Sequence, residues 1–422
     1  MVWLCVSYEV PAYLEVPTRE IDAMQAGGSR AFISTLTSDS SSTDTGSDGA
    51  VDRIWKRNAR PVAAIFIHAG AGYHSIKNEK VHLDACSEAA RIGMKFLKAG
   101  GGAPAAVEAA IRSLEDKEIT NAGFGSNLNM DGVVECDATL VDHLGRSGAC
   151  GAVPGIKNPI SLAKLILDAS NQPLAVELRE ATSCRHDTTF PPLPMVGEQD
   201  ERRKRKASGG QSPAGCVGSG FNGDASDLNP DDADTDRITD TVGAIAIDSQ
   251  GNIAAGSSSG GIGMKHGGRI GPAALVGIGT AVIPEDPADD EARSVAAVTS
   301  GTGEHMATSL ASARCAERLF HGARRGAGGR HIDEDDDRAL MEAFVIDDFM
   351  GHPGVRNQTS PGAIGVMAVK KCRAGIYFYF AHNTDSFALA SMTATEREPV
   401  CVMSRLGQSG DVAQGARKIP TS

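Results

Sequence analysis

The sequence predicts an α/β protein, and three observations support this prediction. The chain of 422 residues contains 49 glycines, and 41% of its residues are hydrophobic although only 5% are aromatic. This composition favours a layered fold packed with alanine, valine and isoleucine. Short apolar runs typical of buried strands alternate with segments whose apolar residues recur every three or four positions, as on one helix face. These segments form two blocks, separated by a long polar stretch over residues 170–240.

The first ordered block covers residues 61–169. An apolar run predicts a buried strand over 61–68, and glycines follow it. Helical spacing predicts helices over 82–99, 103–114 and 160–169, with another strand over 133–141.

The second block begins with a predicted β-hairpin. Branched and small apolar residues occupy 242–247, a turn follows over 248–252, and a second apolar run begins at Ile253. Thr241 therefore stands at the first position of the leading strand. A helix is predicted over 305–319, and strands over 363–369 and 376–381.

A threonine at the start of a strand, after a loop that can be cut, is what an N-terminal-nucleophile hydrolase requires. A threonine hydroxyl is a poor nucleophile at neutral pH and needs a base. Cleavage between Asp240 and Thr241 would free an α-amine, whose pKa of about 7.7–8.0 suits a general base. The nucleophile and its base would then belong to one residue.

This cleavage site divides the chain into regions. Residues 1–60, with a Ser/Thr/Asp tract over 34–47, are expected to be a disordered extension. Residues 61–240 are the predicted N-terminal (alpha) subunit, which ends in the flexible linker 170–240. Residues 241–422 are the C-terminal (beta) subunit, and the two subunits together are expected to form one domain.

Charge and cysteine usage exclude several classes of function. The net charge of −12 argues against direct, nonspecific binding of nucleic acid. The nine cysteines include no CxxC pair, and their odd number argues against a disulfide framework. We therefore expect no metal, no other cofactor and a reducing compartment, and no apolar run suggests a membrane segment.

Seven motifs occur in the order seen in the type 2 asparaginase family, which includes glycosylasparaginase and threonine aspartase. They are His68-Ala-Gly-Ala-Gly72, Thr120-Asn-Ala-Gly-Phe-Gly-Ser-Asn127, Glu135-Cys-Asp-Ala138, Asp240-Thr-Val-Gly-Ala, Ser258-Ser-Gly-Gly261, His266-Gly-Gly-Arg269 and Ser300-Gly-Thr-Gly-Glu304. The chain resembles the threonine aspartase branch most, whose proteases cut after aspartate. The resemblance implies a four-layer αββα N-terminal-nucleophile sandwich, built from cleaved chains that stay associated and dimerise.

The resemblance also implies roles for single residues. Thr241 is the nucleophile, and Ser259 is a second hydroxyl that tunes its amine. Ser300 and the N–H of Gly301 form the oxyanion hole, although Ser300 or Thr302 could equally cap the helix that follows. Asn121 and Gly70 shape the pocket, or serve only as turn residues.

Arg269 is expected to bind the carboxylate of the substrate's aspartate, because a buried carboxylate needs a cation. In asparaginases, an aspartate three residues after this arginine holds the α-amine of a free amino acid. Here the residue is Pro272, which cannot accept a hydrogen bond from an ammonium. This departure favours a protease. Lys77 is the predicted second cation, with Lys80 in reserve.

The densest basic run predicts a nuclear import signal that an importin would read, or else a solvated charge run. Its residues are Arg202, Arg203, Lys204, Arg205 and Lys206. We therefore expect the protein in the nucleus and also in the cytoplasm. The resemblance implies protein substrates with an internal aspartate, such as mixed-lineage-leukaemia-type (trithorax) methyltransferases and the transcription factor TFIIA.

Two other functions remain open. The first is an asparaginase or isoaspartyl peptidase that acts on small substrates. The second is an unprocessed nuclear scaffold, because the segment before Thr241 is shorter than the family pattern suggests.

Overall fold

The computed structural model describes residues 2–4, 62–170, 241–360, 362–407 and 410–420. The linker over 171–240, with Asp240 and the basic run, lies outside these residues. Within the extension 1–60 the description covers Val2–Leu4, which form strand β1 and pair in parallel with β4 (Ser147–Pro154). The edge of a sheet offers unpaired N–H and C=O groups, which explains this pairing.

An eight-stranded sheet forms one inner layer of the described fold, in the order β1-β4-β3-β6-β5-β2-β13-β14. The other strands are β2 (Ala64–Gly72), β3 (Glu135–Val141), β5 (Val242–Ile247), β6 (Ile253–Ser259), β13 (Ser386–Thr393) and β14 (Val400–Arg405). The predicted hairpin is confirmed, since β5 and β6 pair in antiparallel register with Val242 opposite Ser258.

A five-stranded sheet forms the second inner layer, in the order β15-β12-β11-β8-β7. Its strands are β7 (Thr280–Ile283), β8 (Ser294–Gly301), β11 (Ile364–Cys372), β12 (Gly375–His382) and β15 (Ala413–Ile419). The two sheets pack face to face through a core that includes Phe66 and Ile245 from one sheet and Val298 and Phe378 from the other. Side chains alternate across each strand, so the opposite faces are left for helices to cover.

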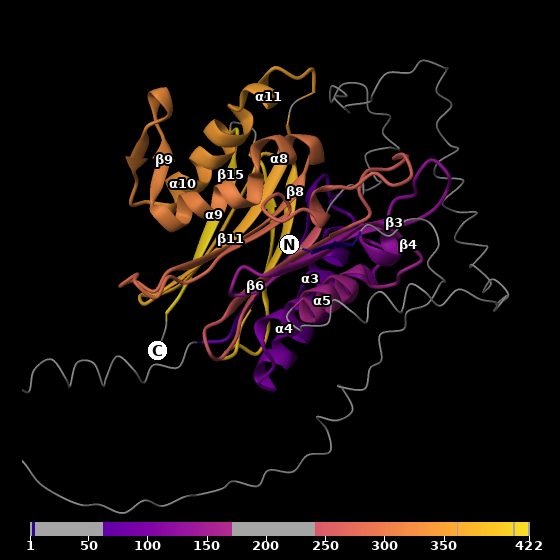
Figure 1. Ribbon diagram of the computed structural model, residues 1–422, viewed down its shortest axis with the longest axis horizontal. Helices are drawn as coiled ribbons and strands as arrows, with labels where there is room; N and C mark the ends of the chain where they lie inside the picture. The colour runs from indigo at the N-terminus through magenta and orange to yellow at the C-terminus, as the bar shows by residue number, and fades with distance from the viewer. Residues whose placement is uncertain (1, 5–61, 171–240, 361, 408–409, 421–422) are drawn as a thin grey trace, which may run out of the picture.

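Three helices cover the outer face of the larger sheet (Figure 1). They are α3 (Glu79–Lys98), α4 (Ala103–Glu115) and α5 (Pro159–Ala169), and they confirm the three helices predicted in the first block. Met94 and Ile111 from these helices pack with Leu140 of β3 in one fully buried cluster.

Helices α9 (Ala311–His321) and α10 (Asp337–Ala343) and the π-helix η5 (Phe344–Met350) cover the smaller sheet on the opposite side (Figure 1). The single helix predicted over 305–319 is wrong. Two helices, α8 (Gly303–Ser309) and α9, meet at Leu310, whose left-handed backbone (φ 52°) ends the first helix. The layers confirm the αββα sandwich that the resemblance implies.

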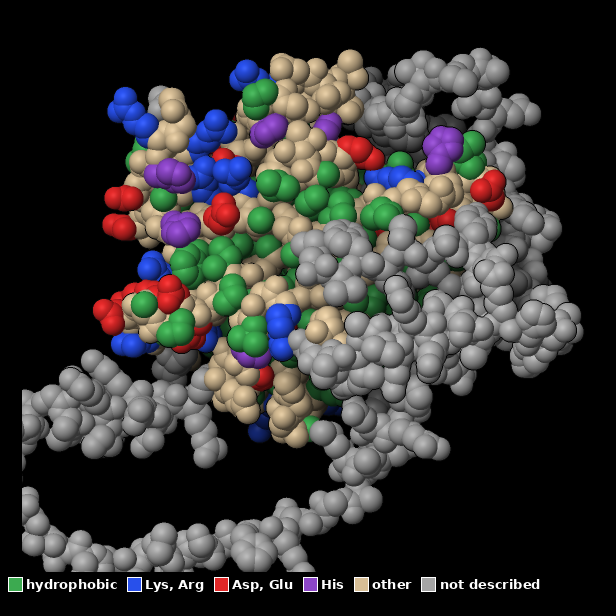
Figure 2. Space-filling model, in the orientation of Figure 1, with side chains coloured by type: hydrophobic (Ala, Val, Ile, Leu, Met, Phe, Trp, Pro, Cys, Tyr) green, Lys and Arg blue, Asp and Glu red, His purple; other side chains and the backbone are tan. Residues whose placement is uncertain are grey.

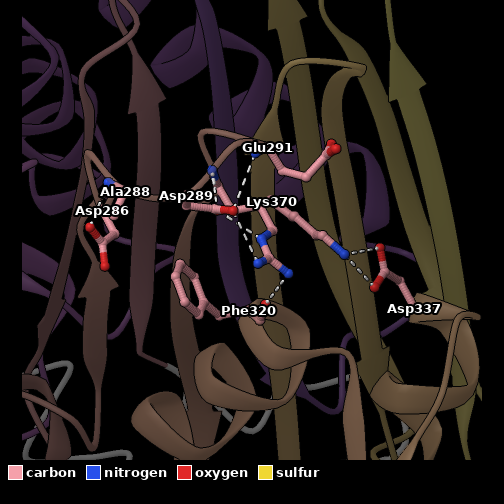
Figure 3. Close-up of polar contacts among 8 residues, drawn as sticks. Asp286, Ala288, Asp289, Glu291, Phe320, Asp337 and Lys370 are labelled. Atoms are coloured by element: carbon pink, nitrogen blue, oxygen red, sulfur yellow. Dashed lines mark hydrogen bonds and ion pairs between the residues drawn. The ribbon is translucent and has the colours of Figure 1, made fainter.

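The outer face of the smaller sheet carries a polar cluster (Figure 3). Lys370 of β11 points to Asp337 at the start of α10, with its Nζ 2.8 and 3.0 Å from the two carboxylate oxygens. Positive and negative side chains are interspersed around α10 and the nearby strand β9 (Ala323–Arg325) (Figure 2). Among the residues that the structure describes, no helix is long and apolar enough to cross a bilayer.

Candidate active site

Thr241 directly precedes β5, a central strand of the larger sheet, and is 5% exposed. The antiparallel register pairs Val242 with Ser258, so the next pair places Thr241 opposite Ser259. The predicted nucleophile and the predicted second hydroxyl therefore lie on neighbouring strands.

Gly243, two residues after Thr241, packs directly against His68 of β2. A Cβ at Gly243 would collide with the imidazole Nε2, so the strand accepts only glycine at this position. Burial lowers the pKa of His68 to about 3, which keeps the imidazole neutral at physiological pH. The start of β5 is thus tightly packed against a neutral imidazole.

Ser259 ends β6, is 4% exposed, and its Oγ accepts the N–H of Gly261 at 3.0 Å. Asn121 holds the same loop, because its Nδ2 donates to the carbonyl of Gly261 at 2.8 Å. Its Oδ1 accepts the N–H of Asn127 at 3.0 Å. Asn121 is fully buried, so the structure gives it a role in positioning the Gly261 loop.

Ser300 is buried near the end of β8, and its Oγ accepts the N–H of Ala71 at 3.2 Å. This bond joins the smaller sheet to β2, the strand beside β5. Gly70 and Gly301 flank the contact with positive φ angles of 104° and 146°, which favour glycine. Thr302 is the N-cap residue of α8 and makes no side-chain cap bond there.

Arg269 lies against Gly261, and a Cβ on that glycine would be 3.1 Å from the guanidinium Nη1. Its Nη2 lies 2.6 Å from Oε1 of Glu304 in α8. Arg269 and Pro272 both border Gly303, where a Cβ would be 3.0 Å from Arg269 Nη2 and 3.0 Å from Pro272 Cδ. The structure therefore brings Arg269 and Pro272 together with the Ser259 loop.

Three lysines bear on the predicted second cation. Lys77 is exposed in the turn before α3, and Lys80 pairs along that helix with Asp84 at 2.5 Å. Lys265 and Arg269 both border Gly261. Lys265 is 2% exposed, its Nζ donates to the carbonyl of Glu135 at 2.7 Å, and it would be 3.5 Å from a Cβ on Gly261. The sequence analysis missed this residue, although it stands four positions before Arg269.

Two buried carboxylates hold the loop that carries Arg269. Asp137 accepts the N–H of Gly271 at 2.8 Å and that of Ala152 at 2.8 Å. Burial raises the pKa of Asp137, while these hydrogen bonds and the nearby Lys265 and Arg269 oppose the increase. Glu135 accepts the N–H of Gly268 on both oxygens, at 3.1 and 3.0 Å. The Glu135-Cys-Asp137 motif was the sequence signal that could have identified both.

Glu115, at the end of α4, has no exposed surface and contacts β6. Its Oε1 accepts the hydroxyl of Ser258 at 2.7 Å and the N–H of Ile160 at 3.0 Å. Burial raises its pKa to about 8, in spite of these hydrogen bonds. This acid is therefore mostly protonated at neutral pH and braces the residue before Ser259.

The described residues contain no group of three or more His, Cys, Asp and Glu side chains placed to hold a metal ion. The arrangement instead combines a hydroxyl at a strand start, a second hydroxyl beside it and a cation on the adjoining loop. Such a set can perform nucleophilic acyl transfer on a substrate that carries a negative charge.

Comparison with known proteins finds asparaginases. The Asparaginase_2 family model, described as Asparaginase, matches residues 61–346. The mouse isoaspartyl peptidase/L-asparaginase is 33% identical over 217 residues, 51% of this chain and 62% of the relative. The human protein of that name is 33% identical over 218 residues, 51% of this chain and 66% of the relative. The plant-type L-asparaginase of Pyrobaculum calidifontis is 30% identical over 225 residues, 52% of this chain and 69% of the relative. The match thus spans less than two thirds of the mouse and human relatives.

Proposed function

The chain belongs to the asparaginase family of autoprocessing N-terminal-nucleophile hydrolases, and from this premise we propose that it is a threonine endopeptidase. It cuts its own chain between Asp240 and Thr241, and then cuts protein substrates after aspartate. The buried position of Thr241 opposite Ser259 supports the first step, and the surroundings of Arg269 support the second.

The chemistry follows from the freed N-terminus. The α-amine of Thr241 takes the hydroxyl proton while Oγ1 attacks the carbonyl carbon of the substrate's aspartate. The peptide C–N bond breaks, and the amine of the leaving chain takes the proton. Water then attacks the resulting ester with help from the same amine, so that a new carboxyl group forms and Thr241 is restored.

Pro272 is the observation that carries the choice of a polypeptide substrate. A free amino acid needs an acceptor for its ammonium beside the arginine that binds its carboxylate. Here the residue three positions after Arg269 is the apolar Pro272, and both side chains border Gly303. An aspartate inside a polypeptide has no free ammonium, so a protease loses nothing there, and a hydrolase of free asparagine would leave an unpaired charge.

Exposed apolar side chains near this site also suit a polypeptide. They are carried by the same two loops as Asn121, Lys265 and Arg269, and comprise Phe124, Met130, Ile262, Met264 and Ile270, each between 39% and 60% exposed. The loops are joined by main-chain hydrogen bonds from Met130 to Lys265 and from Met264 to Leu128, at 2.9 and 2.8 Å. Grouped apolar surface next to a polar site is typical of contact with a larger partner.

An asparaginase or isoaspartyl peptidase is the second candidate, because the relatives carry these names. Incubation with asparagine and with β-aspartyl dipeptides separates the two candidates. Release of ammonia or of free aspartate at rates above those on aspartate-containing peptides would favour the small-molecule enzyme.

Nuclear substrates and import also belong to this proposal. The run Arg202–Lys206 suits recognition by an importin, and its replacement by alanines would then leave a fluorescently labelled protein in the cytoplasm. Nuclear accumulation after the replacement would show that the run is only a solvated charge segment.

Dimerisation of the cleaved pairs would give a mass of about twice 43.8 kDa in sedimentation.

The first test is intact-mass analysis and N-terminal sequencing of purified wild type, Thr241→Ser and Thr241→Ala. We expect a new Thr-Val-Gly-Ala terminus in the wild type, slower cleavage in Thr241→Ser and none in Thr241→Ala. Peptides with one aspartate, and matched peptides with asparagine or glutamate, then test specificity. A wild-type chain that stays whole, with activity or partner binding retained in Thr241→Ala, would support the scaffold instead.

A further inference from the structure

The proposed substrate-binding cation already has a carboxylate partner. Nη2 of Arg269 lies 2.6 Å from Oε1 of Glu304, the second residue of α8. The arginine side chain is 20% exposed and the glutamate side chain is 65% exposed. The same kind of contact, between a guanidinium and a carboxylate, is the one that a substrate aspartate needs.

Arg269 is held in place from three sides. A Cβ on Gly261, Gly271 or Gly303 would approach its guanidinium to 3.1, 3.1 or 3.0 Å. Its loop is fixed by the hydrogen bond between Asp137 and the N–H of Gly271, at 2.8 Å. The guanidinium is therefore closely surrounded by the main chain of three glycines.

Glu304 is the movable partner of the pair. Its side chain is mostly exposed, whereas Asp137 behind the loop is fully buried and bound to two main-chain N–H groups. Burial opposes ionisation of Glu304, but the hydrogen bond and charge of Arg269 together lower its pKa, so it stays charged at neutral pH. An ion pair with one mostly exposed partner is weak, because water solvates the Glu304 carboxylate well.

We propose that Glu304 occupies the substrate-carboxylate position on Arg269 in the empty enzyme, and that it acts as an internal competitor. This inference rests on the proposed function. The aspartate carboxylate displaces Glu304 on binding. After hydrolysis, Glu304 returns to Arg269 and helps to expel the N-terminal product, which still carries that aspartate.

A tethered competitor acts like a ligand at a fixed effective concentration. It raises KM for every substrate that must displace it, and it weakens product inhibition to the same degree. An exposed pair of about 0.4–1 kcal/mol corresponds to a factor of roughly two to five in KM. Glu304 thus lowers the affinity for substrate and speeds the release of product.

The test compares processed wild type with Glu304→Gln and Glu304→Ala on a peptide with one aspartate. Glu398→Gln is the matched control, since Glu398 forms an exposed pair with Arg91 at 2.5 Å on α3, away from the Arg269 loop. We expect KM, and the inhibition constant of N-acetyl-L-aspartate, to fall about two- to fivefold in both Glu304 variants. N-acetyl-L-alanine, which lacks the side-chain carboxylate, should be unaffected, and Glu398→Gln should behave as wild type.

Unchanged or increased KM and inhibition constants in the Glu304 variants would overturn the inference, with the proposed function left intact. If processed wild type fails to cut the aspartate peptide, the proposed function falls. The inference is then tested without turnover, by the increase in Tm that N-acetyl-L-aspartate gives. A larger increase in Glu304→Gln than in wild type supports the competitor, and an equal or smaller one overturns it.

Discussion

Arg269 and Arg318 each bind one carboxylate, but in very different surroundings. Arg318 of α9 holds Asp348 of η5 through two parallel hydrogen bonds, Nε to Oδ2 and Nη2 to Oδ1, both 2.8 Å. Both of these side chains are 5% exposed. Arg269 holds Glu304 through one nitrogen, and its partner is mostly in water. The difference in burial separates a contact that stabilises the fold from one that a ligand can exchange.

The strongest test of this comparison is Arg318→Met. The change leaves Asp348 charged and buried without its partner, so we expect the free energy of unfolding to fall by about 3–5 kcal/mol. Urea unfolding followed by circular dichroism measures the loss. Glu304→Gln, treated in parallel, should lose no more than about 1 kcal/mol.

A double variant, Arg318→Met with Asp348→Leu, is the control for this result. Replacement of a whole buried pair by apolar side chains is often neutral. The double variant should therefore recover most of the stability that Arg318→Met loses. A double variant as unstable as the single one would show that packing, and not the unpaired charge, accounts for the loss.

Glu115 sharpens the comparison, because it is a buried carboxyl with no arginine. Burial raises its pKa in the fold to about 8, well above the ordinary value of 4.5, so near neutral pH the folded state holds a proton that the unfolded state releases. Stability from this group is complete below the unfolded value and is lost as pH rises toward the folded value, by at most ~1.4 kcal/mol per pH unit.

Glu115→Gln should flatten this dependence, since glutamine stays neutral. The measurement is the midpoint of urea unfolding at pH 5, 7 and 9 for both proteins. The wild type should lose more stability than the variant between pH 5 and pH 9. Parallel profiles would mean that Glu115 ionises in the fold at its ordinary pH.

The smallest effect is expected for Glu398→Gln. The pair between Arg91 and Glu398 is exposed at both ends, at 49% and 70%. We expect no resolvable change in the midpoint of urea unfolding, at low or at high salt. A clear loss, in the same urea titration, would show that exposure alone does not separate the two kinds of pair.

Features that depend on neighbouring residues could be predicted from the sequence, whereas contacts between distant residues could not. The hairpin that carries Thr241 and Ser259 could be predicted, because its period-two alternation and its turn lie within 20 residues of chain. The helices α3, α4 and α5 were predicted for the same reason. The break at Leu310 was not, because a left-handed leucine has no sequence signature.

The partners of the site residues could not be predicted, because they are distant along the chain. Glu304 is 35 residues from Arg269, and Lys265 finds its carbonyl partner 130 residues away, at Glu135. Lys77 was predicted from the family resemblance, in which a lysine follows the glycine motif, and a buried lysine such as Lys265 is rare. The motif order indicated which loops matter, but not which side chains meet.

Pro272 has one further consequence, for how such enzymes change specificity in evolution. It is the first residue of the short 3-10 turn η3 (Pro272–Ala274), where a proline's missing N–H is one that the turn leaves unused. The neighbouring Gly271 keeps its bond to Asp137, so the arginine before it stays anchored. An acid at this position can therefore mutate to proline while the fold is preserved. Under the proposed function, this one position would separate recognition of a small molecule from recognition of a polypeptide.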